Sequence, residues 1–193
     1  MRKEIFRYLV LCTVLLTTIS VTGCDAVYRL LQKEGAEEKE IVGEIRPFER
    51  NEKVAEVQKL LKLYGYGVGQ PDGVMGVNTR NAIEKFQEDS GIKASRFVDK
   101  KTWRSLHRFD DYGLVRNGEI NVLVIQTDLH TLGFYKGEPD GKRGPKTDEA
   151  IRAFQKARGL TPDGKVGLKT LQALVNSFSY TGGGSFKTPR PFA

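Results

Sequence analysis

The sequence contains one stretch twice, and this internal repeat constrains the fold more than any other feature. Gln58 aligns with Gln126, an offset of 68 residues, and the same offset holds without a gap as far as Leu106 and Leu174. The identical pairs include Leu61 and Leu129, Gly65 and Gly133, Pro71-Asp72-Gly73 and Pro139-Asp140-Gly141, Phe86-Gln87 and Phe154-Gln155, and Lys101-Thr102 and Lys169-Thr170. A gapless match of this length indicates two copies of one small module, and a chain of 193 residues has room for both.

Each copy has the pattern of three short helices. In the first copy, apolar residues at helical spacing run from Val54 to Tyr64, and Gly65 follows where a left-handed C-cap belongs. Thr79 is the expected N-cap of the second helix, and Asp99 is that of the third. The later helices have apolar faces formed by Ala82, Ile83, Phe86, Trp103 and Leu106, and in the second copy by Ala150, Ile151, Phe154, Leu168, Leu171 and Leu174. We therefore predict an all-α fold in which each module has a small core of its own.

The turns between these helices share the pattern Asp-Gly-x-x-Gly-x-x-Thr. It occurs at Asp72 to Thr79, at Asp140 to Thr147 and at Asp163 to Thr170. Glycine accepts a positive φ in such a turn, and the aspartate can accept hydrogen bonds from the backbone amides that follow it. The first module lacks its last copy, because residues 95–99 (SRFVD) stand where the second module has residues 163–167 (DGKVG). We expect this turn to be built differently.

The N-terminus has the pattern of an export signal. Three basic residues precede an apolar run from Tyr8 to Val21, which is short for a membrane-spanning helix. Val21-Thr22-Gly23-Cys24 resembles the lipobox of bacterial lipoproteins, in which the cysteine is acylated and the preceding signal is removed. The resemblance implies lipidation of Cys24, and several acyl chains give durable anchoring. An uncleaved anchor and an ordinary signal with a fortuitous cysteine are the alternatives.

These observations predict five segments. They are a signal peptide at 1–23, the lipidated cysteine with a charged linker at 24–53, modules at 54–108 and 121–176, and a flexible tail at 177–193. The linker contains a charged run at residues 33–40 (KEGAEEKE) without an apolar period, which is typical of a solvated spacer.

The net charge of the chain is +7. Removing residues 1–23, which hold three basic residues and one acidic residue, leaves +5. A mildly basic protein suits an anionic partner such as wall carboxylates, anionic lipid or nucleic acid, although the charge can also serve solubility alone.

The order of the motifs in each copy resembles the bacterial peptidoglycan-binding domain of type 1. The first copy has Val57-Gln58-Lys59-Leu60-Leu61, Gly65-Tyr66, Asp72 to Thr79, Ala82-Ile83 and Phe86-Gln87. The second has Ile125-Gln126, Gly133-Phe134, Asp140 to Thr147, Ala150-Ile151, Phe154-Gln155, Gly159-Leu160 and Asp163 to Thr170. The resemblance implies a three-helix module that binds the glycan or the stem peptide of the cell wall.

Most of the matched residues have a sufficient explanation as turn, cap or core, so the ligand contacts must be sought elsewhere. We expect them among polar or aromatic residues near the loop between the first two helices. These are Tyr66, Gln70, Asp72 and Arg80 in the first module, and Phe134, Glu138, Asp140 and Arg143 in the second. An aromatic face can stack on a sugar, and arginine can bind a carboxylate through two parallel hydrogen bonds.

The residues needed for catalysis are scarce. The only histidines are His107 and His130, Cys12 and Cys24 are confined to the N-terminus, and the Ser90 to Lys93 match to Ser-x-x-Lys has no companion motif. The repeats also leave no room for a catalytic domain. We therefore predict a protein that is not an enzyme, with no metal and no cofactor. An undetected hydrolase is kept as an alternative because paired acids cannot be judged from spacing.

The leading interpretation is a peptidoglycan-binding lipoprotein of the bacterial cell envelope, which faces the periplasm or wall and tethers a membrane to the cell wall. Its partners would be peptidoglycan and, through Cys24, the membrane, but not nucleic acid. The alternative is an adaptor that recruits or regulates a cell-wall hydrolase or an envelope complex.

Overall fold

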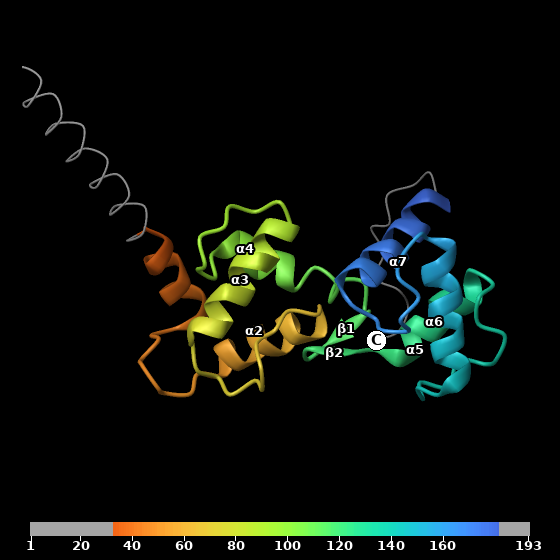
Figure 1. Ribbon diagram of the computed structural model, residues 1–193, viewed down its shortest axis with the longest axis horizontal. Coiled ribbons are helices and arrows are strands. Elements are labelled where there is room, and N and C mark those ends of the chain that lie inside the picture. Colours follow the sequence, from red (N-terminus) through yellow and green to blue (C-terminus); the bar gives the residue numbers. More distant parts are fainter. Residues whose placement is uncertain (1–32, 182–193) are drawn as a thin grey trace, which may run out of the picture.

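The computed structural model describes residues 33–181, so the predicted signal peptide, Cys24 and most of the predicted tail lie outside the described residues. The prediction of an all-α fold with two tandem three-helix modules is confirmed (Figure 1). Module 1 contains α2 (Glu52–Leu63), α3 (Val77–Asp89) and α4 (Lys100–Leu106). Module 2 contains α5 (Val122–Thr131), α6 (Pro145–Ala157) and α7 (Leu168–Thr181).

The ends of the helices follow local chemistry, with one exception. Gly65 follows Tyr64, the C-cap residue of α2, with φ of 97°, and the Asp99 side chain accepts a hydrogen bond from the Thr102 amide at 2.7 Å, as predicted. The prediction that Thr79 caps α3 is wrong, because that helix begins at Val77 with Gly76 as its N-cap. Thr79 lies in the first turn of α3 and is buried, since its hydroxyl is held by another side chain described below.

A short β-hairpin connects the modules. Its strands β1 (Val115–Arg116) and β2 (Glu119–Ile120) pair antiparallel, with Val115 opposite Ile120. Both turn residues, Asn117 and Gly118, have positive φ. Asn-Gly is the strongest short-range signal for a two-residue hairpin turn, so the sequence contained a signal for this element that the predictions above did not use.

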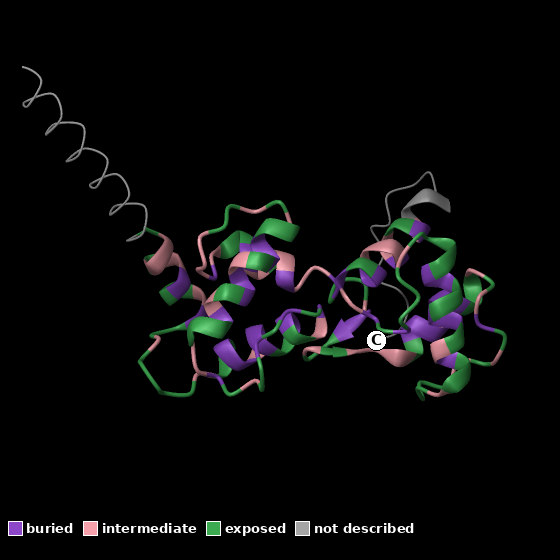
Figure 2. Cartoon of the chain, in the orientation of Figure 1, coloured by how far each residue is buried: buried purple, intermediate pink, exposed green. Residues whose placement is uncertain are grey.

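The two modules share one hydrophobic core. Residues of the connecting segment are buried along with the helices: Phe109 is 2% exposed and Leu114 is 0% exposed. Tyr64, at the end of α2, packs edge-on against Phe109 with ring centres 5.7 Å apart. The resulting cluster extends from α2 to α7 (Figure 2). The expectation of a separate core for each module is therefore wrong, because the buried connection joins them.

The charged run predicted to be a solvated spacer is helical and packed against module 1. We call residues 33–42 the docked helix. Glu38 and Val42, one turn apart, are each 3% exposed. The Glu38 carboxylate accepts hydrogen bonds from both terminal nitrogens of Arg80, at 2.6 and 2.8 Å, and from the Val98 amide at 2.8 Å. The prediction of a solvated spacer is wrong for these residues, because the buried Glu38 carboxylate binds Arg80 and Val98 and so holds the charged helix against module 1.

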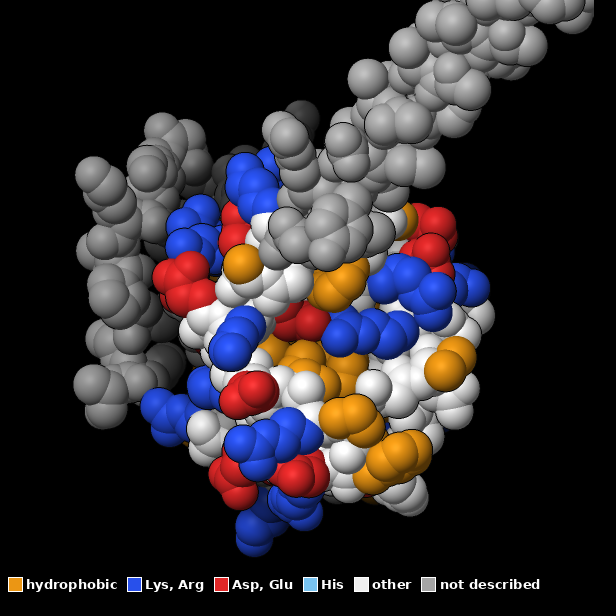
Figure 3. All heavy atoms as spheres, turned by 90° about the vertical axis from the view of Figure 1, so that its left-hand side faces the viewer, with side chains coloured by type: hydrophobic (Ala, Val, Ile, Leu, Met, Phe, Trp, Pro, Cys, Tyr) orange, Lys and Arg blue, Asp and Glu red, His pale blue; other side chains and the backbone are white. Residues whose placement is uncertain are grey.

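The surface at this end of the molecule carries charges of both signs. Lys and Arg side chains lie among Asp and Glu side chains, around a small group of hydrophobic side chains (Figure 3). Exposed pairs such as Lys93–Glu34 at 2.7 Å and Lys100–Glu40 at 3.0 Å join module 1 to the docked helix.

The first residues of the predicted flexible tail, 177–181, belong to a helix. α7 continues to Thr181, and Ser177 is 6% exposed with its hydroxyl donating to the Ala173 carbonyl at 2.7 Å. Among residues 33–181, no helix combines the length and apolar character needed to cross a membrane.

Candidate functional site

Buried glutamines hold the repeated turns. Gln58 donates through Nε2 to Asp72 Oδ1 at 2.9 Å, to the Val74 carbonyl at 3.1 Å and to Thr79 Oγ1 at 2.9 Å. Its Oε1 accepts from the Gly73 amide at 2.7 Å. Because one side chain satisfies the Asp, Gly and Thr positions of the motif, the motif is a device for closing the turn. It is not by itself a ligand site.

The same arrangement recurs in module 2. Gln126 donates to Asp140 Oδ1 at 2.9 Å and to Thr147 Oγ1 at 3.0 Å, and Gln155 donates to Asp163 Oδ1 at 2.9 Å and to Thr170 Oγ1 at 3.1 Å. Sequence reasoning missed this role of the glutamines, although the repeated Gln58/Gln126 and Gln87/Gln155 pairs were visible.

Two of the predicted contact residues, Asp72 and Asp140, are exposed members of these turns. Asp72 accepts from the Val74 amide at 2.9 Å, and Asp140 accepts from the Lys142 amide at 2.9 Å. These backbone hydrogen bonds, followed by the bond from the buried glutamine, lower the pKa of each carboxyl. Both groups are therefore charged at neutral pH and are already engaged by the turn.

The two predicted aromatic contacts pack against the core. Tyr66 is 9% exposed and lies edge-on to Phe86 at 5.7 Å. Its hydroxyl donates to Asp89 Oδ2 at 2.9 Å, and burial followed by this bond raises the pKa of the phenol. Phe134 is half-buried and lies edge-on to Phe154 at 5.5 Å. Neither ring therefore stands free of the core.

The two predicted arginines bind groups of this chain. Arg80 holds Glu38 and also donates to the Arg96 carbonyl at 2.9 Å. Arg143 donates from Nε to Asp148 at 2.8 Å and from a terminal nitrogen to the Gly164 carbonyl at 2.7 Å. Each guanidinium thus already pairs with a carboxylate.

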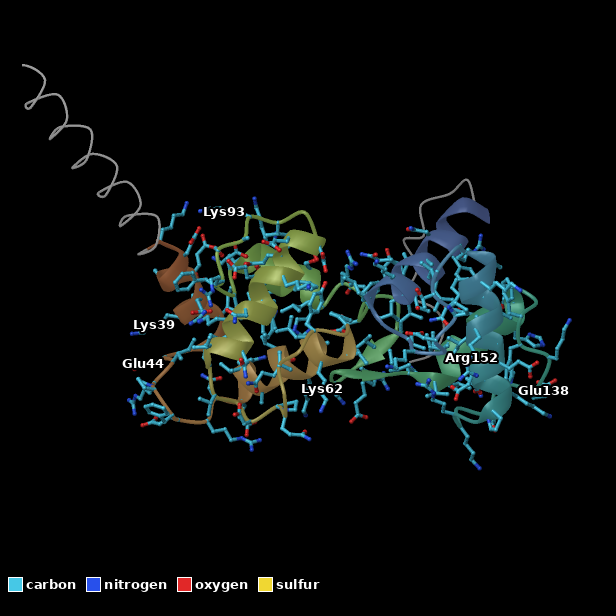
Figure 4. All side chains as sticks on the ribbon, in the orientation of Figure 1. Lys39, Glu44, Lys62, Lys93, Glu138 and Arg152 are labelled. Atoms are coloured by element: carbon cyan, nitrogen blue, oxygen red, sulfur yellow. The ribbon has the colours of Figure 1, made fainter. Side chains whose placement is uncertain are left out.

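The remaining two predicted residues are exposed and lie far apart in the molecule. Gln70 accepts from Lys62 Nζ at 3.3 Å, and Glu138 lies on the side of module 2 away from module 1 (Figure 4). The structure therefore does not bring the eight predicted residues together on one surface.

A groove of about 880 Å³ lies where the two modules meet. Module 1 contributes the end of α2 and one face of α3, and module 2 contributes the loop after α6 and the start of α7. Its charged lining residues are Lys62, Lys85, Asp89, Asp163, Lys165 and Lys169. Figure 4 shows Lys62 on α2 at the side of module 1 that faces module 2. Of the predicted residues, Tyr66 alone lines this groove.

Sequence reasoning missed the groove because its walls come from segments about one module apart. The two walls meet closely: a Cβ placed on Gly167 would lie 3.6 Å from the Tyr64 carbonyl oxygen. Within residues 33–181, no group of three or more His, Cys, Asp or Glu side chains is placed to hold a metal ion.

The fold and the groove define a tandem helical repeat protein with a groove of mixed polar and apolar lining at the junction of its modules. The model of the peptidoglycan binding domain family matches residues 50–106 and 119–174, which together make up more than half of the chain. The chain belongs to this family.

The relatives of this chain include proteins that are named as enzymes. It is 32% identical over 114 residues to the N-acetylmuramoyl-L-alanine amidase CwlM of Mycobacterium tuberculosis, covering 54% of this chain and 28% of the relative. It is 43% identical over 91 residues to the spore cortex-lytic enzyme of Bacillus cereus, covering 46% of this chain and 35% of that protein. The chain thus spans about a third or less of the length of these relatives.

A further match is to a protein with a different kind of name. The localization factor PodJL of Caulobacter vibrioides is 43% identical over 54 residues, which cover 28% of this chain and 6% of that protein. No solved structure matches the chain.

Proposed function

We propose that this chain is a non-catalytic peptidoglycan-binding protein that holds a membrane and the cell wall together. The observation that carries the proposal is the tandem match to the peptidoglycan binding domain family, which covers α2 to α4 and most of α5 to α7. Two modules in one chain favour retention on a polymer, because the second contact forms at the high effective concentration set by the first.

The proposal of a membrane anchor rests on the sequence around Cys24, which lies outside the described residues. In this arrangement an acylated Cys24 would hold one end of the protein at a bilayer, and Lys33 of the docked helix lies nine residues after it. Because Glu38 fixes that helix to Arg80 of module 1, the segment between the acylated cysteine and the wall-binding modules would be short and partly rigid.

Sedimentation with purified sacculi tests wall binding. The full chain in mild detergent should pellet with insoluble peptidoglycan and remain in the supernatant without it. A protein of similar basic charge without these modules serves as the control for nonspecific adsorption. Recovery of the full chain in the supernatant at every sacculus concentration would contradict the proposal.

Metabolic labelling with a fatty acid tests the anchor, and the chain supplies its own control. The wild-type chain and the Cys12→Ser variant should incorporate label and fractionate with membranes. Cys24→Ser should lose both properties, because it lacks the only cysteine preceded by Thr22-Gly23. Labelling of Cys24→Ser equal to that of the wild type would refute the anchor.

A second candidate function is that of an adaptor for a wall enzyme. Two observations favour it. The relatives are named as an amidase and a cortex-lytic enzyme, and each shares with this chain only the aligned part. Affinity purification from the native envelope, followed by an assay of muropeptide release, distinguishes the two functions. A co-purifying hydrolase that is activated by the chain supports the adaptor. Muropeptide release by the pure chain would overturn the non-catalytic proposal itself.

A further inference from the structure

We propose that the groove between the modules is a composite site for the carboxylates of the peptidoglycan stem peptide. The inference rests on the proposed peptidoglycan binding and adds where the ligand sits and which chemistry is recognised. Neither module carries this site alone, because Lys62 and Lys85 come from module 1 while Lys165 and Lys169 come from module 2.

The lysines of the groove are available for a ligand, whereas its aspartates are already used. All four lysines are exposed, and in the part of the chain that the structure describes none of them makes an ion pair. Asp89 accepts the Tyr66 hydroxyl at 2.9 Å. Asp163 accepts from Gln155 Nε2 at 2.9 Å and from the Lys165 amide at 2.8 Å. With four lysines and two carboxylates in its lining, the groove has a net positive charge of +2 (4 − 2).

The repeat shows that most of these lysines are not needed to build a module. At the offset of 68 residues, Lys62 corresponds to His130, Lys85 to Ala153 and Lys165 to Phe97. Only Lys169 has a lysine counterpart, Lys101. By contrast, the glutamines that hold the turns, Gln58 and Gln87, and core residues such as Phe86 are identical in both copies. Positive charge has instead been placed on the two surfaces that face each other.

The size and lining of the groove suit a short anionic peptide. A volume of about 880 Å³ is within the range of pockets that bury small organic ligands. Gly65 and Gly67 on one wall and Gly159 on the other have no other atom within 4 Å of the place where a Cβ would stand, so the main chain is open there. A peptide backbone can pair with such walls, while its carboxylates meet the lysine ammonium groups.

Calorimetric titration of the full chain with a soluble disaccharide–tetrapeptide muropeptide tests the site. Lys85→Glu and Lys169→Glu place one reversed charge on each wall. Each should weaken binding about tenfold, because a ligand carboxylate loses one cationic partner and meets a like charge in its place, and the double variant should weaken binding further. The matched control is Lys101→Glu, the repeat counterpart of Lys169, which is exposed and outside the groove; it should change affinity less than about twofold.

Two further measurements separate charge from fold and from other ligands. Lys85→Gln, which removes the charge and keeps a polar side chain, should give an intermediate loss, and every variant should melt within a few degrees of the wild type. A muropeptide with its carboxylates amidated should bind the wild type about tenfold more weakly and should no longer respond to the lysine substitutions.

The outcomes distinguish this inference from the proposed function. If the chain binds sacculi and muropeptide but Lys85→Glu and Lys169→Glu bind as tightly as the wild type, the groove is not the site while wall binding stands. If only one wall responds, the composite site is refuted. If the lysines are needed for a phosphate polymer of the wall and not for muropeptide, the ligand assignment is wrong. If the wild type binds neither sacculi nor muropeptide, both proposals fall.

Discussion

The last turn of module 1 and the last turn of module 2 have the same shape although they share few residues. Gln155 donates to Asp163, the Lys165 carbonyl and Thr170, whereas Gln87 donates to Ser95 Oγ, the Phe97 carbonyl and Thr102. Arg96 has φ of 68°, close to the 74° of its counterpart Gly164. The comparison teaches that the buried glutamine makes the turn, and that the Asp-Gly motif is one of two ways to fit around it.

The same two turns are also supported from outside by different arginines. The Arg96 carbonyl accepts from Arg80, and its counterpart, the Gly164 carbonyl, accepts from Arg143. Arg80 is paired with Glu38 of the docked helix, while Arg143 is paired with Asp148 inside its own module. Module 1 therefore depends on the segment that precedes it for a contact that module 2 makes for itself.

Removing the glutamines tests the comparison most strongly. Gln155→Leu and Gln87→Leu should each lower the free energy of unfolding by about 3 kcal/mol, because several buried partners lose their hydrogen bonds at once. Urea unfolding measures the loss. Gln70→Leu, at an exposed position, is the control and should change stability by less than about 0.5 kcal/mol. A large loss for Gln155→Leu beside a negligible one for Gln87→Leu would show that the two turns are not equivalent.

The ion pairs of the two arginines should differ in their contribution to stability, whereas the two glutamines should contribute about equally. Arg80→Ala leaves the Glu38 carboxylate, 3% exposed, without its main partner and should cost about 2–3 kcal/mol. Asp148→Ala breaks a partly exposed pair and should cost less than about 1 kcal/mol. Thermal unfolding gives both values, and limited proteolysis should show faster cleavage within residues 33–42 of the Arg80→Ala protein. Equal losses from the two substitutions would contradict the dependence of module 1 on the docked helix.

A smaller effect is expected at the left-handed position of each turn. In Gly164→Ala the alanine would keep a positive φ that is unfavourable for it, and its Cβ would lie 3.2 Å from the Arg152 guanidinium. Stability should therefore fall by about 1 kcal/mol. Arg96→Gly relieves the same backbone strain and should leave stability unchanged or raise it by about 0.5 kcal/mol. Denaturant midpoints compare the two, and a clear loss in Arg96→Gly would mean that the arginine side chain itself supports the turn.

The smallest difference in stability between the last turns of the two modules should appear at acidic pH. Hydrogen bonds from the backbone and from the buried glutamines lower the pKa of Asp72, Asp140 and Asp163, so each is lower in the folded state than in the unfolded chain, where it is about 3.9. Their contribution is present above about pH 4 and is lost as the pH falls through the lowered values. Asp163→Asn should therefore flatten the acid limb of a stability–pH curve. Ser95→Asn, at the corresponding position of module 1, should leave the acid limb unchanged.

The prediction of the fold from the sequence succeeded where the signals are local. The apolar spacing in α2, the positive φ of Gly65 and the cap at Asp99 depend on residues within one or two turns of each other, and the gapless repeat carried these signals to the second module. The Asn117-Gly118 hairpin belongs to the same class, since its signal was present and unused.

The prediction failed where contacts join distant segments. Threonine is a residue type favoured at helix N-caps, but Gln58, 21 residues earlier, donates a hydrogen bond to the Thr79 hydroxyl inside the fold. Glu38 lies in a run that composition assigns to solvent, yet it is buried against Arg80, 42 residues away. Neither pairing follows from local spacing, because a hydrogen bond between distant residues depends on how the helices pack.

The repeat thus remains what the sequence alone determined: two copies of one helical module, of a recognisable family, in one chain. The tertiary structure decided how the copies face each other. Packing of the buried connection around Phe109 and Leu114 joins the two cores, and this brings Lys62 and Lys85 opposite Lys165 and Lys169. A surface made from both copies cannot be found in either one, because it exists only once hydrophobic burial has fixed their relative orientation.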